Sequence, residues 1–413
     1  MNDGGRHGLA RPWATVARMA VGFVCALALT AAGKPPAAPK GAPKDPNAME
    51  VRADAALLVD IDTGTVLFEK NADKPLLLGN LTKLMTAAVV AREIKAGRLS
   101  LEGEFTISTH AWKTGGAPSH TTTMFAPINS KAKVGDLIQG MAVQMANDGA
   151  IALAEGIAGT EGAFSDVMNK YAVELGLQNA HFANPSGLPD PGNKASARDL
   201  YRIARTLIVE HPDVYRLYGA REFTYNKIRQ FNRNPLINDG VGGDGLAVDG
   251  AKGTAPGEGG FNIVGSAVQN KQRLVVVLGA SAVEKERNED ARKLLEWGFR
   301  TFEMVHLYQP GEKIGEASVF GGAKTGVDIA ADKAVDILIP RGNRDKLRAK
   351  VVYSGPIKAP IAKGQPIGKL VVTRGETVIQ EVPVAAIEDV GVGNFRQRAI
   401  DGTRELLLGL FRR

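Results

Sequence analysis

Asn80 and Lys83 have the spacing in this 413-residue chain that points most directly to chemistry. They are three residues apart in GNLTKLMT, at the start of a predicted helix, so both side chains project from the same helical face. Enzymes that form acyl intermediates place a serine and a lysine in this way, and the lysine amine, its pKa lowered by burial, removes the serine proton. Here the first residue is an asparagine, whose amide nitrogen is not a nucleophile. Because asparagine is a favourable N-cap, we expect Asn80 to cap the helix.

Other residue types that carry chemistry do not assemble a second site. The glycines at 240, 242 and 245 match G-x-G-x-x-G, but strand-like residues follow them, so we interpret this segment as a loop and expect no nucleotide cofactor. The only cysteine is Cys25, near the N-terminus. We expect no metal site, because the five histidines beyond residue 32 are scattered without a partner at ligand spacing: His110, His120, His181, His211 and His306.

Residues 1–32 have the pattern of a signal peptide. Basic residues precede an apolar run at 19–29, and small residues follow it. The run is shorter than the ~20 residues that a membrane-spanning helix needs. We therefore expect export and removal of this segment, with an uncleaved anchor as the alternative. Residues 33–48 are rich in Pro, Ala and Lys and are predicted to be a linker.

The composition is that of an ordinary globular protein, with 44% hydrophobic and 23% charged residues. The formal net charge of +7 suits contact with an anionic membrane or cell wall. No basic run interleaved with aromatic residues indicates nucleic-acid binding, so we expect none.

The elements that would position Asn80 and Lys83 follow one another as strands, helices and strands again. Asp62-Thr63-Gly64 supplies a turn between two apolar runs, which predicts a hairpin. Ser196, with Asp199 three residues later, predicts a capped helix start. We expect helices at 81–99, 134–157, 161–175, 197–209 and 289–302, and later strands at 245–252, 261–269 and 273–280. This order predicts an α+β domain with an antiparallel sheet.

The C-terminal part of the chain differs in pattern from the preceding domain. Residues 306–392 consist of short apolar runs punctuated by Gly and Pro, which predicts a separate all-β domain. Residues 393–413 place apolar side chains at near-helical spacing among arginines. They are predicted to form a basic amphipathic helix on an anionic membrane surface, with packing on the β domain as the alternative.

Several segments occur in an order and spacing that resemble a known family. They are DIDTGTVLFEKNAD, LTKLMT, VQMANDGAIALAEGIAG, HFANPSGL with SARDL, REFTYNKIRQFNRNPL, VDGAKG and LLEWGFRTFE. From about residue 48 to the C-terminus the chain resembles low-molecular-mass penicillin-binding proteins of the D-alanyl-D-alanine carboxypeptidase class. The resemblance implies a penicillin-binding, serine β-lactamase-like transpeptidase domain at 49–305, followed by the all-β domain and the terminal helix.

The first two motifs of that family are incomplete in this chain. Its Ser-x-x-Lys motif corresponds to Asn80 and Lys83. The residue at the nucleophile position is therefore changed from serine to asparagine, and the lysine at the general-base position is kept. Its Ser-x-Asn motif corresponds to Met145 and Asn147. A thioether cannot donate a proton, and we expect Met145 to be an apolar core residue on a helix face.

The third family motif, Lys-Thr-Gly, is implied to bind the terminal carboxylate of the substrate from an edge strand. Here the residues are Lys252, Gly253 and Thr254. Because successive strand side chains face opposite ways, the shifted threonine is redirected and occupies the place where glycine left room. We expect weakened carboxylate recognition. Intact Lys-Thr-Gly triplets at 113–115 and 324–326 lie outside the VDG context, and we interpret them as chance matches.

Three hypotheses about function follow. The first is a pseudoenzyme of peptidoglycan metabolism that binds or organises stem peptides or cell-wall proteins at the outer face of the inner membrane. The second is an active serine carboxypeptidase that trims pentapeptide stems, which would need another nucleophile. Thr82 is a poor substitute, because it is two residues from Asn80 and lies roughly 200° around the helix from it, and Ser119 lies in GGAPSHTTT. The third is a structural envelope protein without enzymatic activity.

Overall fold

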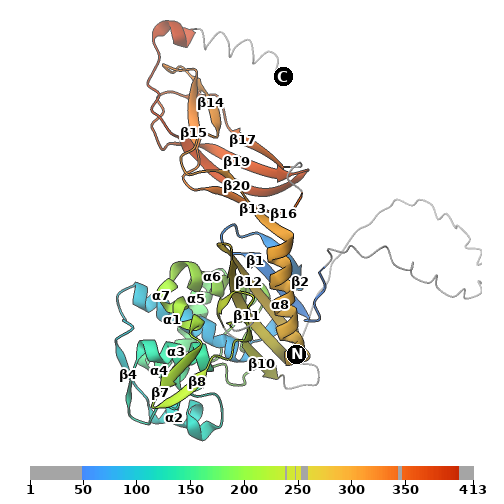
Figure 1. The fold of residues 1–413 in the computed structure, drawn as a ribbon. Helices are drawn as coiled ribbons and strands as arrows, with labels where there is room; N and C mark the ends of the chain where they lie inside the picture. The colour runs from blue at the N-terminus through green and yellow to red at the C-terminus, as the bar shows by residue number, and fades with distance from the viewer. Residues whose placement is uncertain (1–48, 238–239, 247, 253–258, 343–346, 400–413) are drawn as a thin grey trace, which may run out of the picture. The chain divides into compact units, whose positions relative to one another are not determined.

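The computed structural model describes residues 49–237, 240–246, 248–252, 259–342 and 347–399 (Figure 1). Several of the segments discussed above lie outside the described residues. They are the expected signal peptide and linker, Gly253 and Thr254, and the part of the expected terminal helix from residue 400 onward.

A six-stranded antiparallel sheet organises residues 49–301. Its strands lie in the order β10-β11-β12-β1-β2, and β9 also pairs with β11. The hairpin predicted around Asp62-Thr63-Gly64 is confirmed, because this turn joins β1 to β2. The strands are β1 (Ala55–Asp60), β2 (Val66–Lys70), β9 (Gly243–Gly245), β10 (Val248–Lys252), β11 (Gly259–Gln269) and β12 (Gln272–Ser281).

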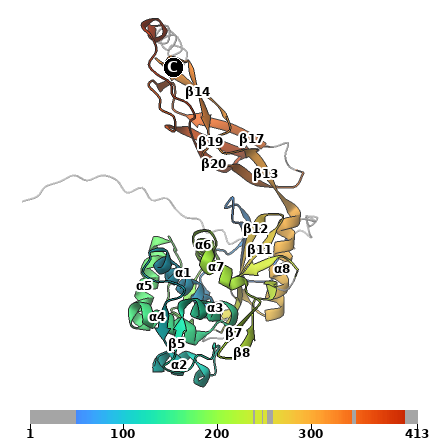
Figure 2. The same ribbon diagram turned by 60° about the vertical axis from the view of Figure 1, so that its left-hand side comes forward.

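Helices cover both faces of this sheet. All six residues of β1 are buried, as are six consecutive residues of β12, and neighbouring strand residues face opposite sides. Figure 2 shows the sheet between α8 on one side and a helical region that includes α6 on the other. The helices are α1 (Thr82–Lys95), α2 (Thr109–Gly115), α3 (Val134–Gln144), α4 (Asn147–Ala158), α5 (Glu161–Glu174), α6 (Ala197–Glu210), α7 (Pro212–Tyr215) and α8 (Glu284–Thr301). The predicted α+β class is confirmed.

The predicted helix at 134–157 is wrong as a single element. It is two helices, α3 and α4, separated at Met145, whose backbone is left-handed with φ 58° and ψ 34°. Ala146 is extended, with φ −61° and ψ 120°, and α4 begins at the next residue. No Gly or Pro lies at the break, and the apolar periodicity continues through it, so the sequence pattern predicts one helix. Likewise, α8 begins at Glu284, five residues before the predicted start.

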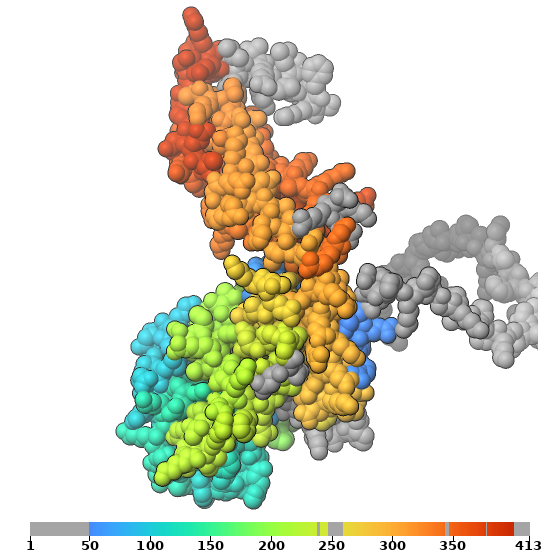
Figure 3. All heavy atoms as spheres, in the orientation of Figure 1, coloured from blue at the N-terminus to red at the C-terminus, as the bar shows by residue number. Residues whose placement is uncertain are grey.

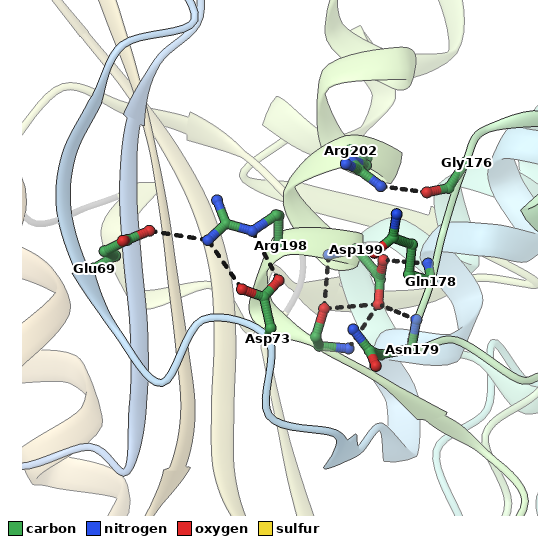
Figure 4. A network of polar contacts seen from close by, with 9 residues as sticks. Glu69, Asp73, Gly176, Gln178, Asn179, Arg198, Asp199 and Arg202 are labelled. Carbon is green, nitrogen blue, oxygen red and sulfur yellow. Dashed lines mark hydrogen bonds and ion pairs between the residues drawn. The ribbon is translucent and has the colours of Figure 1, made fainter.

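The predicted helix start at Ser196 is confirmed as a capping box. The Ser196 side chain accepts the N–H of Asp199, and the Asp199 carboxylate accepts the N–H of Ser196. The same carboxylate also accepts the backbone N–H groups of Gln178 and Asn179, at 3.0 and 3.1 Å (Figure 4). Asp199 is 1% exposed. It therefore joins the start of α6 to the loop that follows α5.

We expect Asp199→Ala to lower the free energy of unfolding by about 1–3 kcal/mol. The substitution removes the acceptor of four hydrogen bonds, three of which come from backbone N–H groups. Urea denaturation would measure the change. Asp73→Ala is a control, because Asp73 pairs with the neighbouring Arg198 but its side chain is 61% exposed, so a loss below about 1 kcal/mol is expected. Equal losses in the two variants would contradict the role given to Asp199.

The C-terminal part is all-β, as predicted, and has its own hydrophobic core. A two-stranded sheet pairs β13 with β16, and a six-stranded sheet has the order β17-β19-β20-β15-β14-β18. We call these residues, 302–392, the β module. Its strands are β13 (Phe302–Tyr308), β14 (Gly315–Phe320), β15 (Gly326–Ala330), β16 (Val335–Pro340), β17 (Leu347–Tyr353), β18 (Ile357–Lys358), β19 (Pro366–Arg374) and β20 (Thr377–Ala386).

The described residues end in the first turn of a helix at 395–399. Asn394 and Gln397 exchange hydrogen bonds between side chain and backbone at its start. The predicted amphipathic helix beyond this turn stays a prediction. In the part of the chain that the structure describes, no helix combines the length and apolar character needed to cross a membrane.

Candidate active site

Asn80 lies in a short 3-10 turn, Gly79–Leu81, directly before α1. The expectation that it caps the helix is wrong, because Leu81 occupies the N-cap position of α1 and makes no side-chain capping bond. Instead, the Asn80 carboxamide oxygen Oδ1 accepts a hydrogen bond from Lys83 Nζ at 2.6 Å. The shared helical face predicted for these two residues is thus confirmed as direct contact.

Lys83 is held inside the protein, with 2% of its surface exposed. Its Nζ donates a second hydrogen bond to the backbone carbonyl of Ser186. Both of these acceptors are carbonyl oxygens, and a carboxamide oxygen has no proton to give up. The contact with Asn80 therefore stabilises a buried amine or ammonium but activates no nucleophile.

The segment 184–188 closes over this pair. Thr86 Oγ1 donates to the carbonyl of Pro185 at 2.7 Å, and the side chain of Asn184 accepts the N–H of Gly187 at 2.7 Å. Gly187 has φ +72°, and a Cβ built on it would overlap the carbonyl oxygen of Gly79 and lie 3.1 Å from Asn80 N. Only glycine allows this approach, so the backbone at 187 sets how closely the segment covers Asn80.

We expect Gly187→Ala to lower the free energy of unfolding by about 1–3 kcal/mol more than Gly97→Ala does. Gly97 is a matched control, because its φ is +71° and nothing lies within 4 Å of a Cβ built there. Both variants carry the cost of a left-handed alanine, about 1–2 kcal/mol. Only Gly187→Ala adds the overlap with Gly79. Chemical denaturation of both variants gives the difference, and equal values would argue against the close contact.

Met145, at the position that the family resemblance implies for the second motif, lies in the hydrophobic core, with 1% of its surface exposed. It is not on a helix face, as was expected, but at the left-handed break between α3 and α4. Its backbone carbonyl accepts a hydrogen bond from Thr122 Oγ1 at 2.7 Å. The apolar role predicted for its side chain is confirmed, and no proton-transferring group stands at this position.

Asn147 is the first residue of α4 and is 3% exposed. Its backbone N–H donates to the carbonyl of Thr122 at 2.8 Å, and its Nδ2 donates to Thr121 Oγ1 at 2.9 Å. The carbonyl oxygen of its side chain is buried and accepts no hydrogen bond. An unsatisfied buried acceptor of this kind is uncommon in native proteins.

Asp148 is a structural residue of the site that sequence analysis did not single out. Its buried carboxylate accepts from Thr123 Oγ1 at 2.6 Å and from the N–H groups of Met124 and Ala126 at 3.0 and 3.2 Å. Burial raises the pKa of this carboxyl above its usual value, while these hydrogen bonds lower it. The signal was a carboxylate within an otherwise apolar helix, in the segment NDGAIALA. Asp148 fixes the segment that carries the partners of Asn147.

The tertiary structure brings the segments of the three motifs together. The helices α1 and α4 are in contact, and β10 lies beside the turn that carries Asn80. Lys252 is the last residue of β10, an end strand of the sheet, and pairs with Gly259 of β11. The backbone of the third motif thus reaches the site as an edge strand.

Comparisons with known proteins agree with this architecture. Residues 41–282 match the D-alanyl-D-alanine carboxypeptidase family, and residues 302–392 match the C-terminal domain of penicillin-binding protein 5. The chain is similar to the D-alanyl-D-alanine carboxypeptidases DacC and DacA of Escherichia coli, at 38% and 35% identity. Each match covers 86% of this chain and 88% of the relative.

Solved structures give the same result. The penicillin-binding protein 5 of Haemophilus influenzae is 34% identical, with a TM-score of 0.75 over 83% of this chain and 98% of that one. The D-alanyl-D-alanine carboxypeptidase DacD of Francisella tularensis is 28% identical, with a TM-score of 0.68 over 85% and 97%. The chain therefore belongs to the D-alanyl-D-alanine carboxypeptidase family, whose members act in cell-wall metabolism.

Proposed function

We infer that this protein is a member of the family that has lost acylation and that binds or organises peptidoglycan or cell-wall proteins. The observation that carries the proposal is the contact between Asn80 and Lys83. At the position where the family resemblance implies a serine, a carboxamide oxygen accepts a hydrogen bond from the buried lysine. Asn80 and Lys83 are thus in contact, but neither the carboxamide nor its oxygen is a nucleophile that the lysine could activate.

Among the residues that the structure describes, no neighbouring hydroxyl is well placed to substitute for the serine. Thr82 Oγ1 is buried and neither accepts nor donates a hydrogen bond. Neither a substrate nor a general base therefore reaches this hydroxyl. Ser119 Oγ donates to the carbonyl of Gly116 at 2.7 Å and contacts Thr121 Oγ1 at 2.7 Å. Ser186 Oγ contacts the side chain of Asn184 at 3.3 Å. These contacts favour the pseudoenzyme over an active carboxypeptidase with a relocated nucleophile.

The retained groups favour a binding role over a purely structural one. Asn147 keeps, at the first residue of α4, the amide that the family resemblance implies for binding the substrate backbone. Lys252 ends an edge strand beside the turn that carries Asn80. We propose that these positions, with Gly253 and Thr254, hold the end of a peptidoglycan stem peptide weakly and without cleavage.

The proposed location follows from the two ends of the chain. Residues 1–32 would direct export and be removed, and residues 393–413 would lie on an anionic leaflet. The protein would then be periplasmic and peripheral on the outer face of the inner membrane.

The test combines acylation with wall binding, using the purified protein without its expected signal peptide. Incubation with fluorescent penicillin, followed by intact-mass measurement, should show no covalent adduct. A stable adduct would overturn the pseudoenzyme. Sedimentation with purified peptidoglycan should carry the protein into the pellet, and addition of a soluble peptide ending in D-Ala-D-Ala should reduce that fraction. If the protein stays in the supernatant at all wall concentrations, the peptidoglycan-binding role is wrong.

A further inference from the structure

The edge strand β17 of the β module has no strand on its outer side among the described residues. It pairs with β19 along its whole length, from Leu347 with Arg374 to Tyr353 with Gly368, without a register shift. The other edge of the same sheet is different, because β18 has only two residues. A long, regular edge leaves a row of backbone N–H and C=O groups able to pair with another chain. β17 is therefore the edge of this sheet that is able to accept a strand.

The side chains of β17 separate onto two faces. Leu347, Val351 and Tyr353 pack against the core of the β module. Arg348, Lys350 and Val352 alternate with them and are exposed, Val352 by 43%. Figure 3 shows the β module in space-filling form, in orange to red. The outer face of the edge strand thus carries two cations and one apolar side chain.

These two cations have no carboxylate partner in the described part of the chain. Elsewhere in the same sheet a lysine is paired, because Lys369 of β19 contacts both carboxylate oxygens of Glu381 at 2.8 Å. Neither Arg348 nor Lys350 makes an ion pair of this kind among the described residues. Since they are two residues apart on a strand, their side chains emerge roughly 7 Å apart on one face. An added strand with acidic residues at alternate positions would match this spacing.

We propose that β17 binds an extended acidic segment of a partner protein by strand addition. Backbone hydrogen bonds to β17 supply the affinity, acidic side chains two residues apart pair with Arg348 and Lys350, and an apolar residue covers Val352. A membrane surface also attracts cations, but lipid headgroups do not present the alternating donors and acceptors that an edge strand needs. The free backbone edge therefore favours a polypeptide as the occupant.

The probe is a fluorescein-labelled ten-residue peptide of alternating Glu and Val, with the purified protein in excess. Fluorescence anisotropy should show saturable binding, and the double variant Arg348→Glu, Lys350→Glu should weaken it by about tenfold or more. The matched control is Lys333→Glu, Lys358→Glu, which changes the same charge away from β17 and should bind like the parent. A peptide in which every Val is replaced by Pro keeps the same charge and should not bind, because proline cannot supply the strand hydrogen bonds.

Hydrogen exchange separates strand addition from charge attraction alone. The acidic peptide should slow amide exchange within 347–353 and leave β18 unchanged. The proposal is overturned if the peptide fails to bind, if exchange in β17 does not slow, or if both double variants lose binding equally. It is also overturned if vesicles containing phosphatidylglycerol slow exchange in β17 and the peptide does not.

Discussion

Restoration of the three family motifs is expected to make the protein react covalently with penicillin. The variant carries Asn80→Ser, Met145→Ser, Gly253→Thr and Thr254→Gly. Serine at 80 would place a hydroxyl beside Lys83 Nζ, which now lies 2.6 Å from the carboxamide oxygen of Asn80. Because loss of such a nucleophile typically costs about 10⁴- to 10⁶-fold in rate, acylation should rise by at least about 10⁴-fold. Stopped reactions with labelled penicillin, read by intact mass, would measure the rate.

The restored protein also provides its own controls. Adding Lys83→Met to it should remove acylation again, because the general base is lost while the apolar part of the buried side chain is retained. Asn80→Ser alone should react more slowly than the full restoration, since the second and third motifs are still altered. Absence of acylation in a fully restored and folded protein would show that the site has lost more than these positions.

Met145→Ser is expected to lower the free energy of unfolding by about 2–4 kcal/mol. The Met145 side chain belongs to the main hydrophobic core and is 1% exposed, so truncation leaves a cavity and introduces a buried hydroxyl. The backbone is left-handed in either case, so its conformational cost changes little. Urea denaturation would measure the loss.

The control for this prediction is Met145→Leu, which keeps the volume and should cost less than about 1.5 kcal/mol. If Met145→Ser left stability unchanged, the methionine would not be part of the packed core. The expected loss means that the restored enzyme is less stable than the natural chain.

Much of the fold could be predicted from local patterns. The turn at Asp62-Thr63-Gly64 and the capping box at Ser196 and Asp199 were predicted from neighbouring residues, and both are confirmed. The break at Met145 was not predicted, because local apolar periodicity favours a continuous helix there. Its carbonyl is held by Thr122, a residue 23 positions earlier in the chain. A hydrogen bond between residues so far apart in the sequence does not change the apolar periodicity of 134–157, so the periodicity could not reveal it.

Some features of the candidate site could likewise be predicted from the sequence, and others depend on the tertiary structure. Chemical identity at 80, 83, 145 and 147 is a property of the sequence, and no fold turns a carboxamide into a nucleophile. The sequence also placed Asn80 and Lys83 on one face, because a spacing of three is a local helical relation. Only the tertiary structure decided that Lys83 is buried against Ser186, 103 residues away, and that Met145 lies at the break between α3 and α4. It also decided that Asn80 contacts the lysine and does not cap the helix. These features depend on which distant segments meet, and burial and hydrogen bonding between such segments are set when the whole chain packs.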